Sequence, residues 1–205
     1  MRVAIVGGTG SFGRALAARL HAAGEEVLVG SRDAERGREV AAELGVEGGA
    51  NEDIAGAADI VILAVKAEGA LETARQLRGT IRSPLLCVAS ELLFSPDGVR
   101  PTPEPSSIAE RVSGLVDVPV VAGLHSLAAR NLAGDEPPDE DAFVCGDDSA
   151  AKELALEVAG KLVNGRSVDT GPLASARALE GLTAVIVNVN RRYKAHVGVR
   201  LTGLR

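Results

Sequence analysis

Short runs of apolar, mostly β-branched residues alternate along the chain with longer segments whose apolar residues recur at helical spacing. The strand-like runs are residues 3–6, 26–30, 59–65, 84–89 and 118–123. The segments between them, such as 34–44 and 70–77, have the 3.6-residue period of helices. Apolar runs without a polar face suit parallel strands that are covered on both sides. The alternation predicts an α/β fold with a doubly wound parallel (Rossmann-type) sheet.

The C-terminal part has an order of its own. A strand is predicted at 142–145, a helix at 150–162 after a cap at 146–149, a short strand at 166–169 and a long helix at 175–194. We therefore predict two domains, 1–123 and a smaller C-terminal α/β domain at 124–205. The last helix is long for so small a unit, and its apolar stripe is expected to seal a homodimer. The stripe consists of Leu179, Leu182, Val185, Ile186 and Val189.

A glycine-rich turn joins the first strand to the first helix. Residues 8–13 have the pattern G-x-G-x-x-G, and Leu16 and Leu20 follow at helical spacing. In such a unit Gly8 permits the tight turn, Gly10 lets the backbone approach a pyrophosphate, and Gly13 lets the helix pack against the strand. The helix N-terminus adds free N–H groups and a positive dipole end. A glycine-rich turn without a ligand is the alternative. The predicted dinucleotide-binding residues are Gly8, Thr9, Gly10, Ser11, Phe12 and Gly13.

The end of the second strand indicates which dinucleotide binds. About 20 residues beyond the glycines an NAD-binding protein carries an acidic residue for the ribose hydroxyls. This chain has Ser31 and Arg32 there, and Arg36 follows one helical turn later. A guanidinium presents a planar set of donors to a phosphate. These residues predict NADP, with the 2′-phosphate at Ser31, Arg32 and Arg36; two solvated arginines are the alternative.

Several connections also carry predictions. Residues 45–50 are interpreted as a glycine-rich connection, and Asn51 as the cap of a short helix. Residues 90–106 contain four prolines and form a long loop after a strand, either a substrate lid or a passive crossing. His125 follows the strand at 118–123, where it orients a ring, donates a hydrogen bond or moves a proton, or else contacts a loop carbonyl. The acidic stretch 135–141 is expected to be solvated.

Composition narrows the classes of partner. The net charge of −6 and the aromatic content of 2% argue against nucleic acid and anionic membranes. Apolar runs fall short of the ~18 residues of a membrane span. Cys87 and Cys145 lie in apolar runs, which is typical of reduced thiols in the cytoplasm, and no metal site is expected. The basic stretch 191–196 contrasts with the acidic whole, and it holds an anionic ligand tail, partner carboxylates or solvent.

With these motifs in place, the chain resembles the NADPH-dependent reductases of the deazaflavin coenzyme F(420), and its residues 188–202 are similar to the actinobacterial branch. The resemblance covers nearly the whole length. The segments that carry it are 6–13, 29–32, 123–125, 144–148, 170–173, 180–183 and 188–202.

The resemblance implies a cytoplasmic, dimeric oxidoreductase that transfers a hydride between NADPH and coenzyme F(420). The two rings would stack in a cleft, and no covalent nucleophile is required. The ring-side residues that the resemblance implies are Ala67, Ser90, His125, Ser126 and Ala129, with His125 as the one catalytic candidate.

Two loops depart from the family pattern. The chain reads Val65-Lys66-Ala67 where the family has Val-Pro and an aromatic residue, and Ala89-Ser90-Glu91 where the family has a proline turn. Both loops are expected beside the rings, where a buried Glu91 would disfavour an anionic deazaflavin. Two other functions therefore compete: an NADP-dependent reductase of a small imine or carbonyl compound, and a non-catalytic NADP-binding sensor. The first requires a proton donor, with His125 or Lys66 as candidates.

Overall fold

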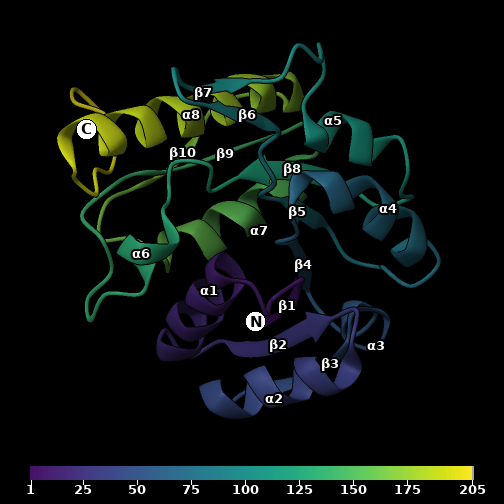
Figure 1. Cartoon of the computed structure of the whole chain (residues 1–205). Coiled ribbons are helices and arrows are strands. Elements are labelled where there is room, and N and C mark those ends of the chain that lie inside the picture. Colours follow the sequence, from purple (N-terminus) through teal and green to yellow (C-terminus); the bar gives the residue numbers. More distant parts are fainter. Residues whose placement is uncertain (205) are drawn as a thin grey trace.

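A computed structural model describes residues 1–204 and contains one eight-stranded sheet and a separate hairpin (Figure 1). The sheet has the order β10-β9-β8-β5-β4-β1-β2-β3, and all of its pairs are parallel except β8 with β9. The predicted doubly wound α/β fold is confirmed. The sheet strands are β1 Arg2–Val6, β2 Glu26–Ser31, β3 Glu47–Ala50, β4 Ile60–Leu63, β5 Leu85–Cys87, β8 Val120–Gly123, β9 Ala142–Gly146 and β10 Ser167–Asp169.

Helices cover both faces of the sheet because the strand side chains alternate between two apolar clusters. Val3 and Ile5 pack with α1, α2 and α7, whereas Ala4 and Val6 pack with α3, α4, α5 and α8. The helices are α1 Ser11–Ala22, α2 Ala34–Leu44, α3 Asn51–Ala55, α4 Ala67–Leu77, α5 Ile108–Ser113, α6 Ala129–Leu132, α7 Ser149–Gly160, the 3₁₀ turn η1 Leu173–Ser175 and α8 Ala176–Tyr193.

The strand order reverses beside β1. From β1 the chain builds β2 and β3 on one side, and then returns to place β4 on the other side. In open parallel sheets the crevice at this reversal, outside the carboxyl ends of the strands, is where ligands bind. The turns after β1 and β4 therefore meet at the expected place for a site.

The sheet is continuous across the predicted domain boundary at residue 123. β9 pairs with β8 in antiparallel register, with Ala122 opposite Cys145, and β10 extends the sheet further. The strands of the C-terminal part thus share one hydrogen-bonded sheet with those of the N-terminal part. The division into 1–123 and 124–205 stays a prediction.

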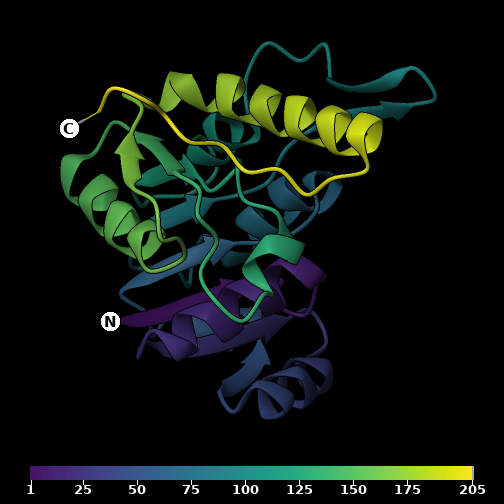
Figure 2. The same ribbon diagram turned by 90° about the vertical axis from the view of Figure 1, so that its left-hand side faces the viewer.

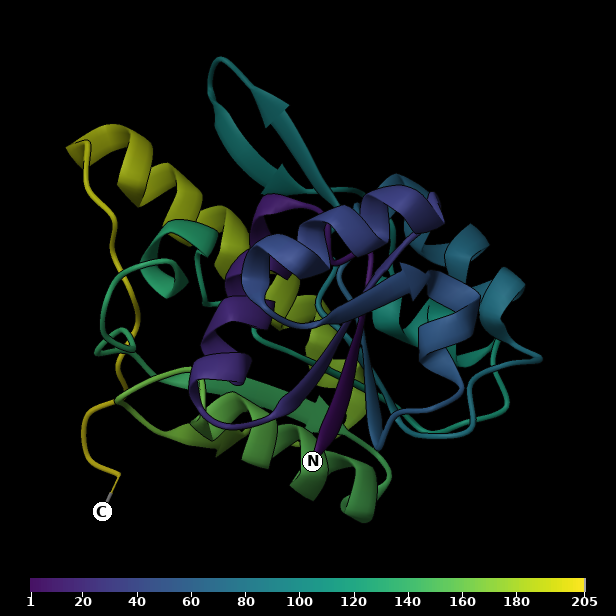
Figure 3. The same ribbon diagram turned by 90° about the horizontal axis from the view of Figure 1, so that it is seen from below.

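Two segments that were predicted as loops contain strands. Residues 45–50 were predicted as a connection but form β3, whose glycines let α2 lie directly on it. A Cβ at Gly37 would come within 2.2 Å of the carbonyl oxygen of Gly49. The segment 90–106 contains a hairpin of β6 Leu92–Ser95 and β7 Gly98–Pro101, which projects from the body in the view from below (Figure 3). Neither β3 nor the hairpin was predicted, because the glycines and prolines of these segments are rare in strands.

The acidic stretch 135–141 is only partly solvated, which corrects the prediction. Asp141 is fully buried, and its carboxylate accepts hydrogen bonds from the Arg166 side chain at 2.9 Å and the Leu201 N–H at 2.8 Å. Burial alone would raise the pKa of Asp141, but Arg166 and these backbone donors hold the pKa at about 2. The carboxylate thereby fixes the C-terminal tail, which runs back from the end of α8 (Figure 2).

The long C-terminal helix ends within one residue of its predicted limits, but its apolar stripe is divided. Leu179 and Ile186 are buried, whereas Val185 is 57% exposed. Val185 therefore lies on the outer face of α8. Among the described residues, no helix is long and apolar enough to span a membrane.

Candidate functional site

A cavity of about 740 Å³ lies outside the carboxyl ends of β1, β4, β5 and β8. Its size is typical of small-molecule sites. The glycine turn and the start of α1 form one end, and the hairpin and α8 form the other. The lining comprises residues 10–13, 64–68, 88–94, Thr102, Leu124, His125, Leu127 and Thr183.

The glycine turn is compact because side chains are absent where backbone segments touch. Gly13 lies directly on Gly8, since a Cβ at Gly13 would come within 2.6 Å of the Gly8 Cα. The backbone with positive φ belongs to Gly7, at 75°, and not to Gly8. The tight turn assigned to Gly8 is thus made by Gly7, while Gly8 donates its N–H to the Gly30 carbonyl at 2.9 Å.

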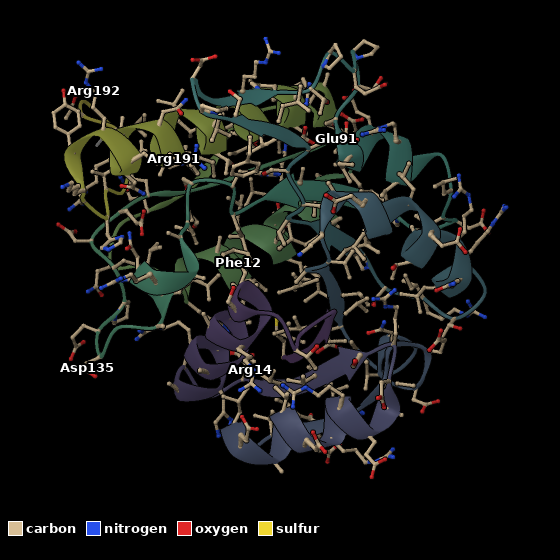
Figure 4. All side chains as sticks on the ribbon, in the orientation of Figure 1. Phe12, Arg14, Glu91, Asp135, Arg191 and Arg192 are labelled. Carbon is tan, nitrogen blue, oxygen red and sulfur yellow. The ribbon has the colours of Figure 1, made fainter. Side chains whose placement is uncertain are left out.

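The first turn of α1 has the features of an anion site. Gly10 is its N-cap residue, no side chain caps it, and the first turn contains no acidic residue. A Cβ at Gly10 would meet only the Gly7 carbonyl oxygen, 3.8 Å away. Open space and uncapped N–H groups therefore coincide, as phosphate binding at a helix N-terminus requires. Thr9 is half-buried in the turn, and Phe12 lies at the start of α1 near the centre of the molecule (Figure 4).

Asn51 supports the glycine turn from α3. It was predicted as a helix cap, but Ala50 is the N-cap residue, and the buried Asn51 side chain accepts the Gly7 N–H at 3.2 Å. A Cβ at Gly30 would lie 2.7 Å from the same Asn51 oxygen. An asparagine at the start of a helix has the sequence pattern of a cap, so this role became visible only in the structure.

The predicted 2′-phosphate residues lie at the end of β2 and in the first turn of α2. Ser31 is buried and its hydroxyl accepts the Asp33 N–H at 3.2 Å, while Asp33 caps α2 by accepting the N–H groups of Glu35 and Arg36. Arg32 is exposed and has no hydrogen bond or ion pair within residues 1–204. Arg36 pairs with Glu39 at 3.1 Å on the exposed face of α2. The turn thus presents an exposed, unpartnered guanidinium at Arg32, next in sequence to the Ser31 hydroxyl.

His125 occupies a strained and buried corner of the cavity. The preceding residue, Leu124, is buried and has φ = 64°, a conformation that bulky residues rarely adopt. Nε2 of His125 donates to the Ala89 carbonyl at 3.3 Å, because a carbonyl can only accept. Nδ1 is then an acceptor, and it is buried without a partner among the described residues. Burial lowers the pKa of His125 to about 4, so the ring is neutral at pH 7.

A chain of hydroxyl groups joins the two ring-side loops to α8. Thr183 donates to the His125 carbonyl at 2.8 Å, so Ser90 donates to the Thr183 hydroxyl at 3.1 Å. Together with the bond between His125 and Ala89, this fixes the loops after β5 and β8. Thr183 was not predicted as a site residue. Its hydroxyl group among the apolar residues of the last helix was the one feature of the sequence that could have indicated this role.

The other predicted ring-side residues divide into two groups. Ala67 and Ser90 line the cavity, with Lys66 exposed beside Ala67. Ser126 and Ala129 lie outside the lining, and the buried Ser126 hydroxyl instead donates to the Asp141 carbonyl at 3.0 Å. Ser126 thus connects the His125 loop to Asp141, the residue that fixes the C-terminal tail.

The carboxylate of Glu91 has partners. It accepts hydrogen bonds from Arg111 at 2.7 Å and from the Thr102 hydroxyl at 2.9 Å, near α5 in Figure 4. A charge-assisted pair of this kind offsets the negative charge that was expected to repel an anionic ring. Arg111 was not predicted, because it lies 20 residues away and only the fold brings the two together. Leu92, Leu93 and Phe94 follow in the lining, and the substrate lid stays a prediction.

Comparison with known proteins places the chain among reductases. The model of the family "NADP oxidoreductase coenzyme F(420)-dependent" matches residues 2–87. The F(420)-dependent NADP reductase of Methanothermobacter thermautotrophicus is 33% identical over all of this chain and 96% of its own. The enzyme of that name from Methanocaldococcus jannaschii is 32% identical, over 100% and 99% of the two chains.

A solved structure extends the similarity to the whole fold. A protein of Arthrobacter sp. FB24, described as a candidate F(420)-dependent NADP reductase, superposes with a TM-score of 0.82. The superposition covers 98% of this chain and 99% of the other, at 25% identity.

Removing the His125 ring should change how stability depends on pH. The ordinary pKa of histidine is 6.5 and that of folded His125 is about 4, so between these values only the unfolded chain takes up the proton. Stability therefore falls as the pH drops from about 6.5 to 4. In H125N this contribution is absent, and the difference in free energy of unfolding from the wild type should shrink across that range. Parallel curves in urea unfolding would contradict the buried, neutral ring.

Proposed function

The chain belongs to the family of coenzyme F(420)-dependent NADP reductases, and we propose that it transfers a hydride between NADPH and the deazaflavin coenzyme F(420). One observation carries this proposal: the glycine turn and the acceptor-side loops open onto the same cavity of about 740 Å³. The two reactants can then meet without an intermediate carrier. NADPH supplies the hydride chemistry, and the protein supplies binding, orientation and exclusion of water.

We propose that the turn from Gly8 to Gly13 binds the pyrophosphate of NADPH. The uncapped start of α1 offers N–H groups and the open side of Gly10 leaves room for phosphate oxygens. Asn51 keeps this turn in shape through the Gly7 N–H. The residues of this site are Gly8, Thr9, Gly10, Ser11, Phe12 and Gly13.

We propose that Ser31, Arg32 and Arg36 bind the 2′-phosphate and thereby select NADPH over NADH. The free Arg32 guanidinium has donors for two phosphate oxygens, and the Ser31 hydroxyl has a hydrogen to donate while it accepts from Asp33. Asp33, the nearest acid, caps α2 by accepting the N–H groups of Glu35 and Arg36 on Oδ1. The position at which NAD-binding sites carry an acid for the ribose hydroxyls is taken here by Ser31 and Arg32.

We propose that Ala67, Ser90 and His125 border the two rings, with Ser126 and Ala129 in the supporting loop. His125 borders the rings as an uncharged side chain, because its ring is neutral at pH 7. The hydroxyl chain through Thr183 holds this corner rigid. Precise placement is the main contribution a protein makes to hydride transfer, since the rate depends on near contact of the reacting carbons.

We also propose a homodimer in the cytoplasm, with small molecules rather than nucleic acid or membranes as ligands. Val185 and Tyr193 expose apolar surface on α8, at 57% and 70% of their area, which a second copy can cover. Burial raises the pKa of the Cys87 thiol to about 12 and that of Cys145 to about 11, which keeps both thiols unreactive in a reducing compartment.

The reaction itself is the first test. Mixed with NADPH and oxidised coenzyme F(420), the protein should bleach the deazaflavin absorbance catalytically, and faster than with NADH. G10V is the matched inactive control, because its side chain fills the phosphate space while the nearest heavy atom to a Cβ is 3.8 Å away; valine is a poorer N-cap than glycine, so its melting temperature should fall by only a few degrees and its fold should be kept. NADPH binding without bleaching would refute the proposal. It would favour imine or carbonyl reduction if such a compound is turned over, and a sensor if none is.

Replacing Arg32 should separate the two nicotinamide cofactors. R32A loses a charge-assisted contact with the 2′-phosphate, which is worth about tenfold or more in affinity, whereas NADH has no such group. The dissociation constant for NADPH should rise by about that factor and that for NADH should stay the same. R38A removes an equal charge from the exposed surface of α2 and should change neither constant. Equal losses for both cofactors in R32A would contradict the assignment.

A further inference from the structure

The end of α8 is basic in a protein whose net charge is −6. Arg191 and Arg192 form its last turn, and Lys194 follows directly. Both arginines are exposed, and neither has an ion pair or a hydrogen bond to another side chain within residues 1–204. Their charges are therefore available to an anionic partner.

Arg191 lies beside a residue of the cavity lining. Its guanidinium carbon is 5.4 Å from the centre of the Phe94 ring, a cation–π geometry, and Phe94 belongs to the cavity lining. Arg192 points outward, away from Phe12 and the centre of the molecule (Figure 4). Arg191 therefore faces the cavity lining, whereas its neighbour Arg192 points away from it.

The hairpin holds Phe94 against α8. The Asn188 side chain accepts the Val99 N–H at 2.7 Å and donates to the Val99 carbonyl at 2.7 Å, so it pairs with β7 as a neighbouring strand would. Phe94 lies opposite Val99 in the hairpin. The position of Arg191 therefore follows from a fixed contact between two elements, while the N–H groups of its guanidinium remain free.

The charges along the cavity favour an anion at this end. Glu91 is paired with Arg111 and does not compete for Arg191. The pyrophosphate and 2′-phosphate sites lie at the opposite end, at the glycine turn and Arg32. A negative group that reaches Arg191 must therefore belong to the molecule on the acceptor side, remote from its ring.

We propose that Arg191 binds a phosphate or carboxylate on the tail of the hydride acceptor, and that this contact makes the protein prefer acceptors with an anionic tail. The inference rests on the proposed function, because it assumes that the deazaflavin ring occupies the cavity. Coenzyme F(420) fits this description, since its phosphate and carboxylate groups lie on a flexible side chain of the ring. Phe94 then supports the tail and Arg191 binds its charge.

The test compares two acceptors and two variants. R191Q and R192Q remove the same charge from adjacent positions, and each is assayed with coenzyme F(420) and with the same deazaflavin that lacks the phosphate and carboxylate groups. R191Q should raise the KM for coenzyme F(420) about fivefold at low salt, the size of an exposed ion pair, and the effect should shrink as salt screens it. The ratio of kcat/KM between the two acceptors should fall accordingly, while R192Q should keep the wild-type ratio.

The outcomes separate this inference from the function on which it rests. If R191Q keeps the wild-type preference for the anionic acceptor, the tail site is refuted while reduction of coenzyme F(420) stands. If R191Q affects both acceptors equally and light scattering shows a smaller assembly, Arg191 binds carboxylates of a partner subunit and the inference fails. If the wild-type protein reduces neither deazaflavin, the proposed function fails first.

Discussion

The contact of Gly13 with Gly8 is the constraint on which the rest of the site depends. Without side chains at these two positions α1 begins directly against the end of β1, and its uncapped N–H groups face the crevice where the strand order reverses. Gly7 completes the turn with a positive φ, and Asn51 accepts its N–H from the neighbouring α3. A larger residue at either contact would separate helix and strand, and the phosphate-binding geometry would be lost.

The acceptor side depends on polar groups that neutralise or fix one another. Glu91 and Lys66 lie in the two loops that were expected to depart from the family pattern, yet Glu91 is paired with Arg111 and bonded to Thr102, and Lys66 is exposed to solvent. His125 is held from three directions by Ala89, Thr183 and the strained Leu124 backbone. The altered loops therefore keep a neutral, rigid corner, which is what stacking of two flat rings requires.

Structure that depends on neighbouring residues could be predicted from the sequence, whereas contacts between distant residues could not. Apolar runs located the strands of the parallel sheet, and glycine spacing located the turn before α1, because each pattern lies within a short stretch of sequence. β3 was hidden since its glycines are needed for contact with α2, and the hairpin since its prolines resemble a loop. Asp141 and Asn51 have buried roles that depend on Arg166 and Gly7, partners no local pattern indicates.

The central claim is that the hydride passes directly between two rings in one cavity from which water is excluded. The most direct measurement uses NADPH that carries deuterium at the transferring carbon, with oxidised coenzyme F(420) in ordinary water. The account predicts that, for one of the two faces of the nicotinamide, the deuterium appears on the reduced deazaflavin with no dilution by solvent hydrogen. Solvent hydrogen at that position, for either face, would contradict direct transfer and the arrangement of the site that implies it.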